Sequence, residues 1–227
     1  MSSKIDRALY GPSWTEVIFG ALLSVVLGVV LAAACLVIRP VAAVKEMPKE
    51  PVAGAVYYLE GSKDSNKGRS WTAKQQQLVS GLSVTVTEEE LNTAVAVLNA
   101  PASRKPGVKE EPAAEAKPSV FVPGPPNFRI RDGQMQIGVP VAVAAFDLGL
   151  NIIVQARGGF EKKGDRFVFS PDTLLIGSCA VDKIPGVTGL VLQKLVGAQA
   201  VPEAIATAWG KLANVTIDGA QLKLDAP

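Results

Sequence analysis

Apolar positions form one long run near the start of the chain and, from about residue 82 onward, a series of short patterned stretches. Residues 17–38 include no charged side chain over 22 positions. A helix of that length spans about 33 Å at 1.5 Å per residue, and the hydrocarbon core of a bilayer is about 30 Å thick. The pattern predicts a single transmembrane helix at 17–38, preceded by a cytoplasmic N-terminus at 1–16.

Two other interpretations of this run stay open. The alanines at 32–34 stand before Cys35, as in a lipoprotein cleavage box, and they also resemble a signal-peptidase site. Against cleavage, the apolar run continues through residues 36–38 and is longer than the core of a typical signal peptide. We therefore expect an uncleaved anchor, with lipidation at Cys35 or removal of the segment as alternatives.

The basic residues around the run do not decide its orientation, because they stand on both sides of it: Lys4, Arg7, Arg39, Lys45 and Lys49. A short polar start followed by one long domain is typical of a signal anchor. We expect the N-terminus inside and the C-terminal domain on the extracytoplasmic side, periplasmic or at the cell surface.

Residues 39–70 carry Pro, Lys and Glu, then Gly and Ser, and they indicate a stalk or linker. The remainder, 71–227, reads as one α+β domain. Alternating apolar residues at 82–86 predict a strand. Thr87 and Glu90 form a capping box that begins a helix, whose apolar stripe ends near Leu98. Seven prolines lie between residues 100 and 127, so we expect 100–126 to be a mobile insertion.

Two Asp-Gly dipeptides predict β-hairpins. A two-residue turn at Asp132-Gly133 pairs Ile130 with Met135 and Phe128 with Ile137. The same construction at Asp218-Gly219 pairs Val215 with Leu222 and Ile217 with Ala220. Both registers place apolar residues opposite one another.

The remaining patterns predict strands at 148–157, 166–170 and 173–181, and helices at 187–196 and 202–212. The fold class expected is therefore α+β: one transmembrane helix, then a curved antiparallel sheet packed with a few helices. One face of the strand after Gly133 is continuously apolar, and its opposite face is mostly small. That face supplies the candidates for an apolar ligand groove: Met135, Ile137, Val139, Val141 and Val143.

Composition narrows the classes of function. The chain has 23 Lys+Arg against 21 Asp+Glu, which gives no electrostatic basis for nucleic-acid binding. It has no histidine, which removes the commonest general base and zinc ligand. We find no catalytic motif, metal site or cofactor motif, and Cys179 reads as a small core residue. We therefore expect no enzyme activity, although a site assembled from distant carboxylates stays an alternative.

Several segments together resemble a kind of envelope protein: TVTEEELNTAVAVL, FRIRDGQMQIGVPVAV, the strands around DLGLNIIVQARGGF, and the closing VTIDGAQLKL. They are similar to membrane-anchored proteins of the YpmS type and to extracytoplasmic phospholipid-binding domains of the LmeA type. The resemblance covers about residues 82–225. It implies an elongated lipid-carrying fold and supplies no catalytic positions.

Two functions follow as hypotheses. In the first, a non-enzymatic domain binds lipid or acyl chains from the adjacent membrane in an apolar groove. In the second, the chain is a structural or assembly subunit that docks on other envelope proteins through a sheet edge or the helix. The ligand, the partners and the oligomeric state are not determined by these patterns.

Overall fold

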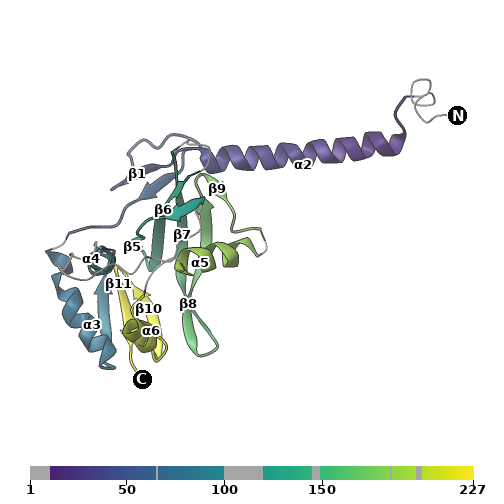
Figure 1. The fold of residues 1–227 in the computed structure, drawn as a ribbon. Helices are drawn as coiled ribbons and strands as arrows, with labels where there is room; N and C mark the ends of the chain where they lie inside the picture. The colour runs from purple at the N-terminus through teal and green to yellow at the C-terminus, as the bar shows by residue number, and fades with distance from the viewer. Residues whose placement is uncertain (1–10, 65, 100–119, 145–148, 185, 198–200) are drawn as a thin grey trace, which may run out of the picture.

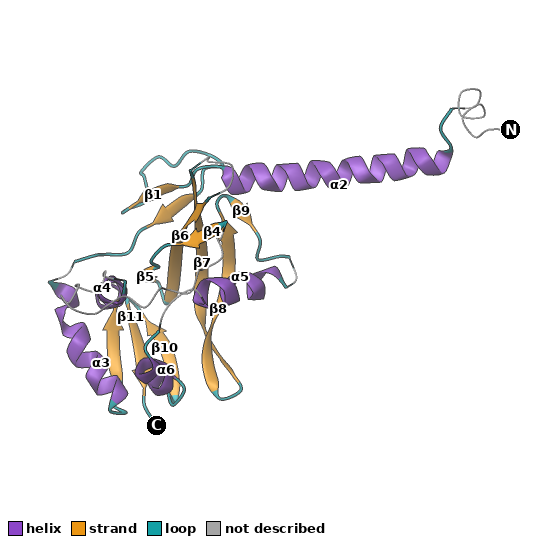
Figure 2. Cartoon of the chain, viewed as in Figure 1, coloured by secondary structure: helices purple, strands orange, loops and turns teal. Residues whose placement is uncertain are grey.

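The computed structural model describes residues 11–64, 66–99, 120–144, 149–184, 186–197 and 201–227. Over these residues the protein is α+β, as expected: antiparallel sheets and a few helices follow one apolar N-terminal helix (Figures 1 and 2). The expected mobile insertion at 100–126 lies mostly outside them, and its last residues form the short strand β4 (Phe121–Pro123).

The apolar helix α2 (Trp14–Ile38) begins three residues before the predicted run. Its start is fixed by a capping box, in which the Ser13 side chain accepts from the backbone of Glu16 and the Glu16 carboxylate accepts from the backbone of Ser13. It ends before Pro40, which cannot continue a helix. None of its residues is buried, and it extends away from the rest of the protein (Figure 1).

The larger sheet has the strand order β4-β6-β7-β8-β9, with β5 also paired to β6. All its pairings are antiparallel. Its strands besides β4 are β5 (Asn127–Arg131), β6 (Gln134–Val143), β7 (Leu150–Lys163), β8 (Arg166–Ile176) and β9 (Cys179–Ala180). The first hairpin has the predicted register, Ile130 opposite Met135 and Phe128 opposite Ile137.

The strand that we expected to end at residue 157 continues as β7 to Lys163. Gly158 causes a bulge and not a break, because the register between β7 and β8 shifts between Arg157 and Gly158. A Cβ atom at Gly158 would overlap the carbonyl oxygen of Ser170. The glycine therefore permits a close approach of the two backbones and lets both strands run on.

The smaller sheet has the order β10-β11-β3 and is covered by three short helices. Its elements are β3 (Val84–Thr87), β10 (Asn214–Asp218), β11 (Gln221–Asp225), α3 (Trp71–Val79), α4 (Glu88–Leu98) and α6 (Glu203–Trp209). The predicted capping box of Thr87 and Glu90 is confirmed at the start of α4. The helix α5 (Val187–Gly197) packs instead on the larger sheet.

The register of the second hairpin differs from the prediction by two residues. Val215 lies opposite Leu224, and Ile217 lies opposite Leu222. Asp218 pairs with Gln221, so the turn is Gly219-Ala220 and not Asp218-Gly219. A slip of two residues keeps every side chain on its predicted face, because side chains alternate with a period of two.

Residues 39–70, which we expected as a stalk, lie partly on the domain. They include a parallel pair, β1 (Ala42–Val44) with β2 (Tyr57–Leu59), and a short 3-10 turn η1 (Lys67–Ser70). Tyr58 is 5% exposed and donates a hydrogen bond to the Asn127 side chain. The Arg129 guanidinium donates to two carbonyl oxygens of the same segment. These contacts join residues far apart in the sequence, which local composition does not reveal.

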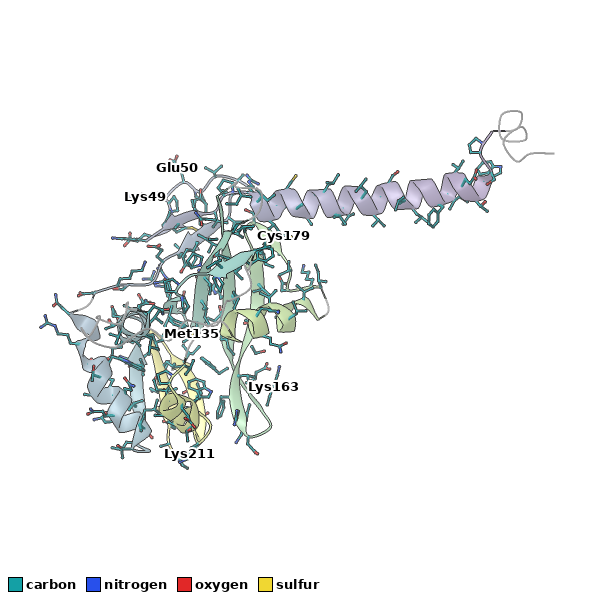
Figure 3. All side chains as sticks on the ribbon, in the orientation of Figure 1. Lys49, Glu50, Met135, Lys163, Cys179 and Lys211 are labelled. Carbon is teal, nitrogen blue, oxygen red and sulfur yellow. The ribbon has the colours of Figure 1, made fainter. Side chains whose placement is uncertain are left out.

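Two hydrophobic clusters form the core. The first lies between the two sheets and includes Ile130, Met135 and Leu222. The second lies under α5 and includes Val139, Val154 and Leu174. Figure 3 shows Met135 in the interior of the domain.

Candidate functional site

The contact between α2 and the larger sheet is the feature that sets how the apolar helix and the domain are joined. The backbone amide of Ser178 donates a 2.9 Å hydrogen bond to the carbonyl oxygen of Leu36. Next to it, Gly177 has a φ of +59°, and a Cβ atom there would overlap the carbonyl oxygen of Val37. The turn between β8 and β9 therefore packs directly on the last turn of the helix. Cys179, labelled in Figure 3, lies near this end of α2.

The helix itself is long and apolar enough to cross a membrane. Its 25 residues have a mean hydropathy of 2.9 over the best window, and none of that window is buried in the domain. Large apolar side chains are exposed all along it, for example Phe19 at 70% and Leu27 at 56%. A helix that is apolar on all sides and unburied is typical of a membrane span and also of a signal sequence.

The groove candidates are buried in the core. Met135, Val139, Val141 and Val143 are 2–8% exposed, and Ile137 packs at the border of both clusters. The two pockets described below are lined by none of them. In this structure their apolar face is filled by side chains of the protein and is not open to a ligand.

The larger of those pockets is a cleft of about 430 Å³ between α3, α6 and the C-terminal residues. Its lining mixes apolar side chains such as Leu78 with the charged side chains of Glu203 and Lys211. Lys211 lies at the end of the domain far from α2 (Figure 3).

Among the residues that the structure describes, the most buried carboxyl group belongs to Glu90, which is 2% exposed. Burial favours the neutral acid, but hydrogen bonds from the Lys74 ammonium, the Ser70 hydroxyl and the Thr87 backbone amide outweigh it and lower the pKa of Glu90 below its ordinary value. These partners use the carboxylate within the fold, linking α3, η1 and α4. The arrangement is structural and leaves no open side to a substrate.

Other chemistry-bearing residues are dispersed. Among the described residues no group of three or more His, Cys, Asp or Glu could hold a metal ion. Asp165 and Asp182 stand in turns, whereas Asp172, expected at a strand end, lies inside β8 at the bulge opposite Arg157 and Gly158; none of them belongs to such a group, and Asp147 lies outside the described residues. Cys179 is half-buried beside the second cluster, and Cys35 is exposed on α2.

Sequence reasoning missed the two residues that make the junction, Gly177 and Ser178. A lone Gly-Ser pair after a strand reads only as a turn. Compared with protein-family models, with curated proteins and with solved structures, the chain matches none of them.

Proposed function

We propose that this chain is a single-pass membrane protein whose α2 spans the bilayer and whose C-terminal domain is a non-enzymatic structural or assembly subunit on the extracytoplasmic side. The observation that carries the proposal is the direct packing of the Gly177-Ser178 turn on the last turn of α2. With that contact the domain follows the helix as one body, which suits a protein that presents surfaces at a defined place beside the membrane.

A second observation supports a domain that rests against the bilayer. The loop after β9 and the first turn of α5 stand out from the larger sheet on the side toward which α2 extends (Figure 1). Ile184 and Leu190 are 50% and 61% exposed there, with exposed Lys183 and Lys194 beside them. Apolar side chains flanked by lysines are typical of a surface that meets lipid headgroups.

The filled face of β6 is the reason for preferring assembly over a lipid groove. A carrier of acyl chains needs a concave apolar site, whereas four of the five groove candidates pack in the two clusters and the fifth, Val143, is 8% exposed. The lipid-binding hypothesis would require the two clusters to open when the ligand enters.

Crosslinking of the full-length protein in intact membranes tests the proposal. Photo-crosslinkers at Ile184 and Leu190 report on lipid and neighbouring proteins, and one at Leu82, which is similarly exposed at 56%, serves as the matched control. Discrete protein adducts would support the assembly role. A monomer without adducts, together with tightly bound lipid in native mass spectrometry, would contradict it and favour the carrier.

A further inference from the structure

Three strands of the larger sheet place arginine and glutamine side chains in one row on the face opposite the core. Arg129 of β5 is paired with Gln136 of β6, and Gln136 is paired with Arg157 of β7. Paired residues on neighbouring strands point to the same side, and neighbouring strands lie about 4.8 Å apart. The Arg129 and Arg157 backbones are therefore about 10 Å apart, which lets two long guanidinium side chains reach one ligand between them.

Leu59 of β2 lies over this row of side chains and completes the lining of a pocket. Leu59 lines a space of about 90 Å³ together with the arginines Arg129, Arg131 and Arg157. The position of β2 is held by Tyr58, whose ring lies so close to Gly138 that a Cβ atom there would overlap it. A space of this size holds several heavy atoms, since one water needs only about 10–15 Å³ on a comparable measure.

The charge in the pocket is unbalanced. Three guanidinium groups line it against one carboxylate, that of Asp132 in the hairpin turn. Within the described part of the chain, the side chains of Arg131 and Arg157 have no hydrogen bond or ion pair with another residue. Arg129 is 8% exposed and uses only its Nη1 atom, on the carbonyl oxygens of Lys45 and Glu60. The other guanidinium N–H groups of Arg129, and those of Arg131 and Arg157, can therefore donate hydrogen bonds to an anion.

A buried amide beside the row is also without a partner. Gln155 is 6% exposed, and its Nε2 atom has no hydrogen-bond acceptor. Its Oε1 atom lies 3.5 Å from Nε2 of Gln136, which lines the pocket. A buried N–H group without an acceptor is unfavourable unless a ligand or water supplies one. Gln155 itself is not part of the pocket lining, but its unused donor lies next to Gln136, and the side chains of Arg131 and Arg157 are exposed and accessible to a ligand.

We propose that this pocket binds a phosphate group, held by the guanidinium groups of Arg129, Arg131 and Arg157. Arginine's planar fork matches the oxygens of a tetrahedral oxyanion, and its charge-assisted hydrogen bonds are the strong ones. The site is lined by residues of β2, β5, β6 and β7 and of the first hairpin turn, so the binding of inorganic phosphate to it does not depend on the membrane role proposed above. The phosphate belongs either to a soluble phosphorylated compound or to a lipid headgroup, since both present the same oxygens.

Inorganic phosphate is the probe for the first experiment. Isothermal titration calorimetry on the full-length protein in neutral detergent, at constant ionic strength, should give saturable binding that raises the melting temperature. Arg131→Gln and Arg157→Gln should each weaken the affinity at least tenfold. Arg166→Gln is the matched control, because Arg166 is an exposed strand arginine that does not line the pocket.

Binding that is absent, or equal in the wild type and both pocket variants, would overturn the proposal. Circular dichroism checks that the variants are folded; both arginines are exposed, so loss of fold is not expected. Nanodiscs with phosphatidic acid separate the two sources. If phosphatidic acid competes with phosphate for the wild type and this competition is lost in Arg157→Gln, the ligand is a lipid headgroup. If phosphate binds but phosphatidic acid does not compete with it, the ligand is a soluble compound.

Discussion

The backbone amide of Ser178 donates a hydrogen bond of 2.9 Å to the carbonyl oxygen of Leu36, so the end of the apolar helix is joined to the tip of the larger sheet. The helix carbonyls in its last turn have no partner inside the helix. One of them is satisfied here by the domain. The end of α2 and the sheet are thus linked by a directional bond between residues 142 positions apart.

Gly177→Ala should weaken this junction. At a φ of +59° any side chain is strained by about 1 kcal/mol, and the overlap of the new Cβ with the Val37 carbonyl oxygen adds about 1–3 kcal/mol. We expect faster hydrogen exchange at the Ser178 amide and at residues near the end of α2, measured on the full-length protein by mass spectrometry.

Gly164→Ala is the matched control for this variant. Gly164 has a φ of +63°, but nothing lies within 4 Å of the Cβ position. The Gly164→Ala variant therefore has the same kind of backbone strain but no new contact with α2. Equal exchange at the junction in both variants would show that the packing of Gly177 on Val37 does not hold the two parts together.

A second variant tests whether the segment before η1 is attached to the domain. Gly138→Ala would place a methyl group into the ring of Tyr58, which should destabilise the packing of β2 by about 1–3 kcal/mol. Limited proteolysis should then cut between residues 45 and 60 more rapidly than in the wild type. Gly159→Ala, with open space around its Cβ position, should leave the cutting rate unchanged. A segment that is already cut rapidly in the wild type would contradict the attachment.

The two hairpins show how far local patterns predict the fold. At the first, Asp132 and Gly133 both have positive φ, at 55° and 70°, as a type I′ turn requires. At the second, only Gly219 does, at 58°, and Asp218 stays in its strand. Both registers bury the same side chains, so the hydrophobic pattern alone could not distinguish them. The hairpin and its faces were predictable, but the turn was not.

Local sequence patterns could not predict the arginine pocket, for a related reason. Arg129 and Arg131 alternate with core residues along β5 and read as an ordinary solvent face. Only the pairing across β6 brings Arg157 beside them, and Leu59 is held over the row by the packing of Tyr58 and by the hydrogen bond from Arg129 to the Glu60 carbonyl oxygen. The same holds for Glu90. Its capping role was predictable from Thr87, whereas its partner Lys74 comes from a helix that we had not predicted.

Leu27→Arg tests the role of α2 as a membrane span. Leu27 lies near the centre of the helix and is 56% exposed. A charge at that depth costs about 3 kcal/mol on insertion scales. We expect a larger fraction of the variant in the soluble phase after carbonate extraction of membranes. Leu82→Arg, at an equally exposed leucine of the domain, should stay with the membrane like the wild type. Equal extraction of both variants and the wild type would contradict a spanning α2.

Glu90→Gln tests the buried ion pair through its dependence on pH. Because the folded state lowers the pKa of Glu90 below its ordinary value of 4.5, the ionised carboxylate stabilises the folded protein above that pH. The stabilisation is lost as the pH falls through the folded-state pKa. We expect the variant to be less stable by about 2 kcal/mol at pH 7, since it lacks the charge-assisted hydrogen bonds of Lys74 and Ser70. Urea unfolding should show this difference constant between pH 5 and 7 and shrinking below about pH 4.5.

Asp218→Asn is the control, because Asp218 pairs with Lys223 at the surface, where water and salt screen the pair. A difference for Glu90→Gln that does not change between pH 7 and pH 3 would mean that folding leaves the pKa of Glu90 unshifted, and would contradict a carboxylate stabilised by Lys74 and Ser70.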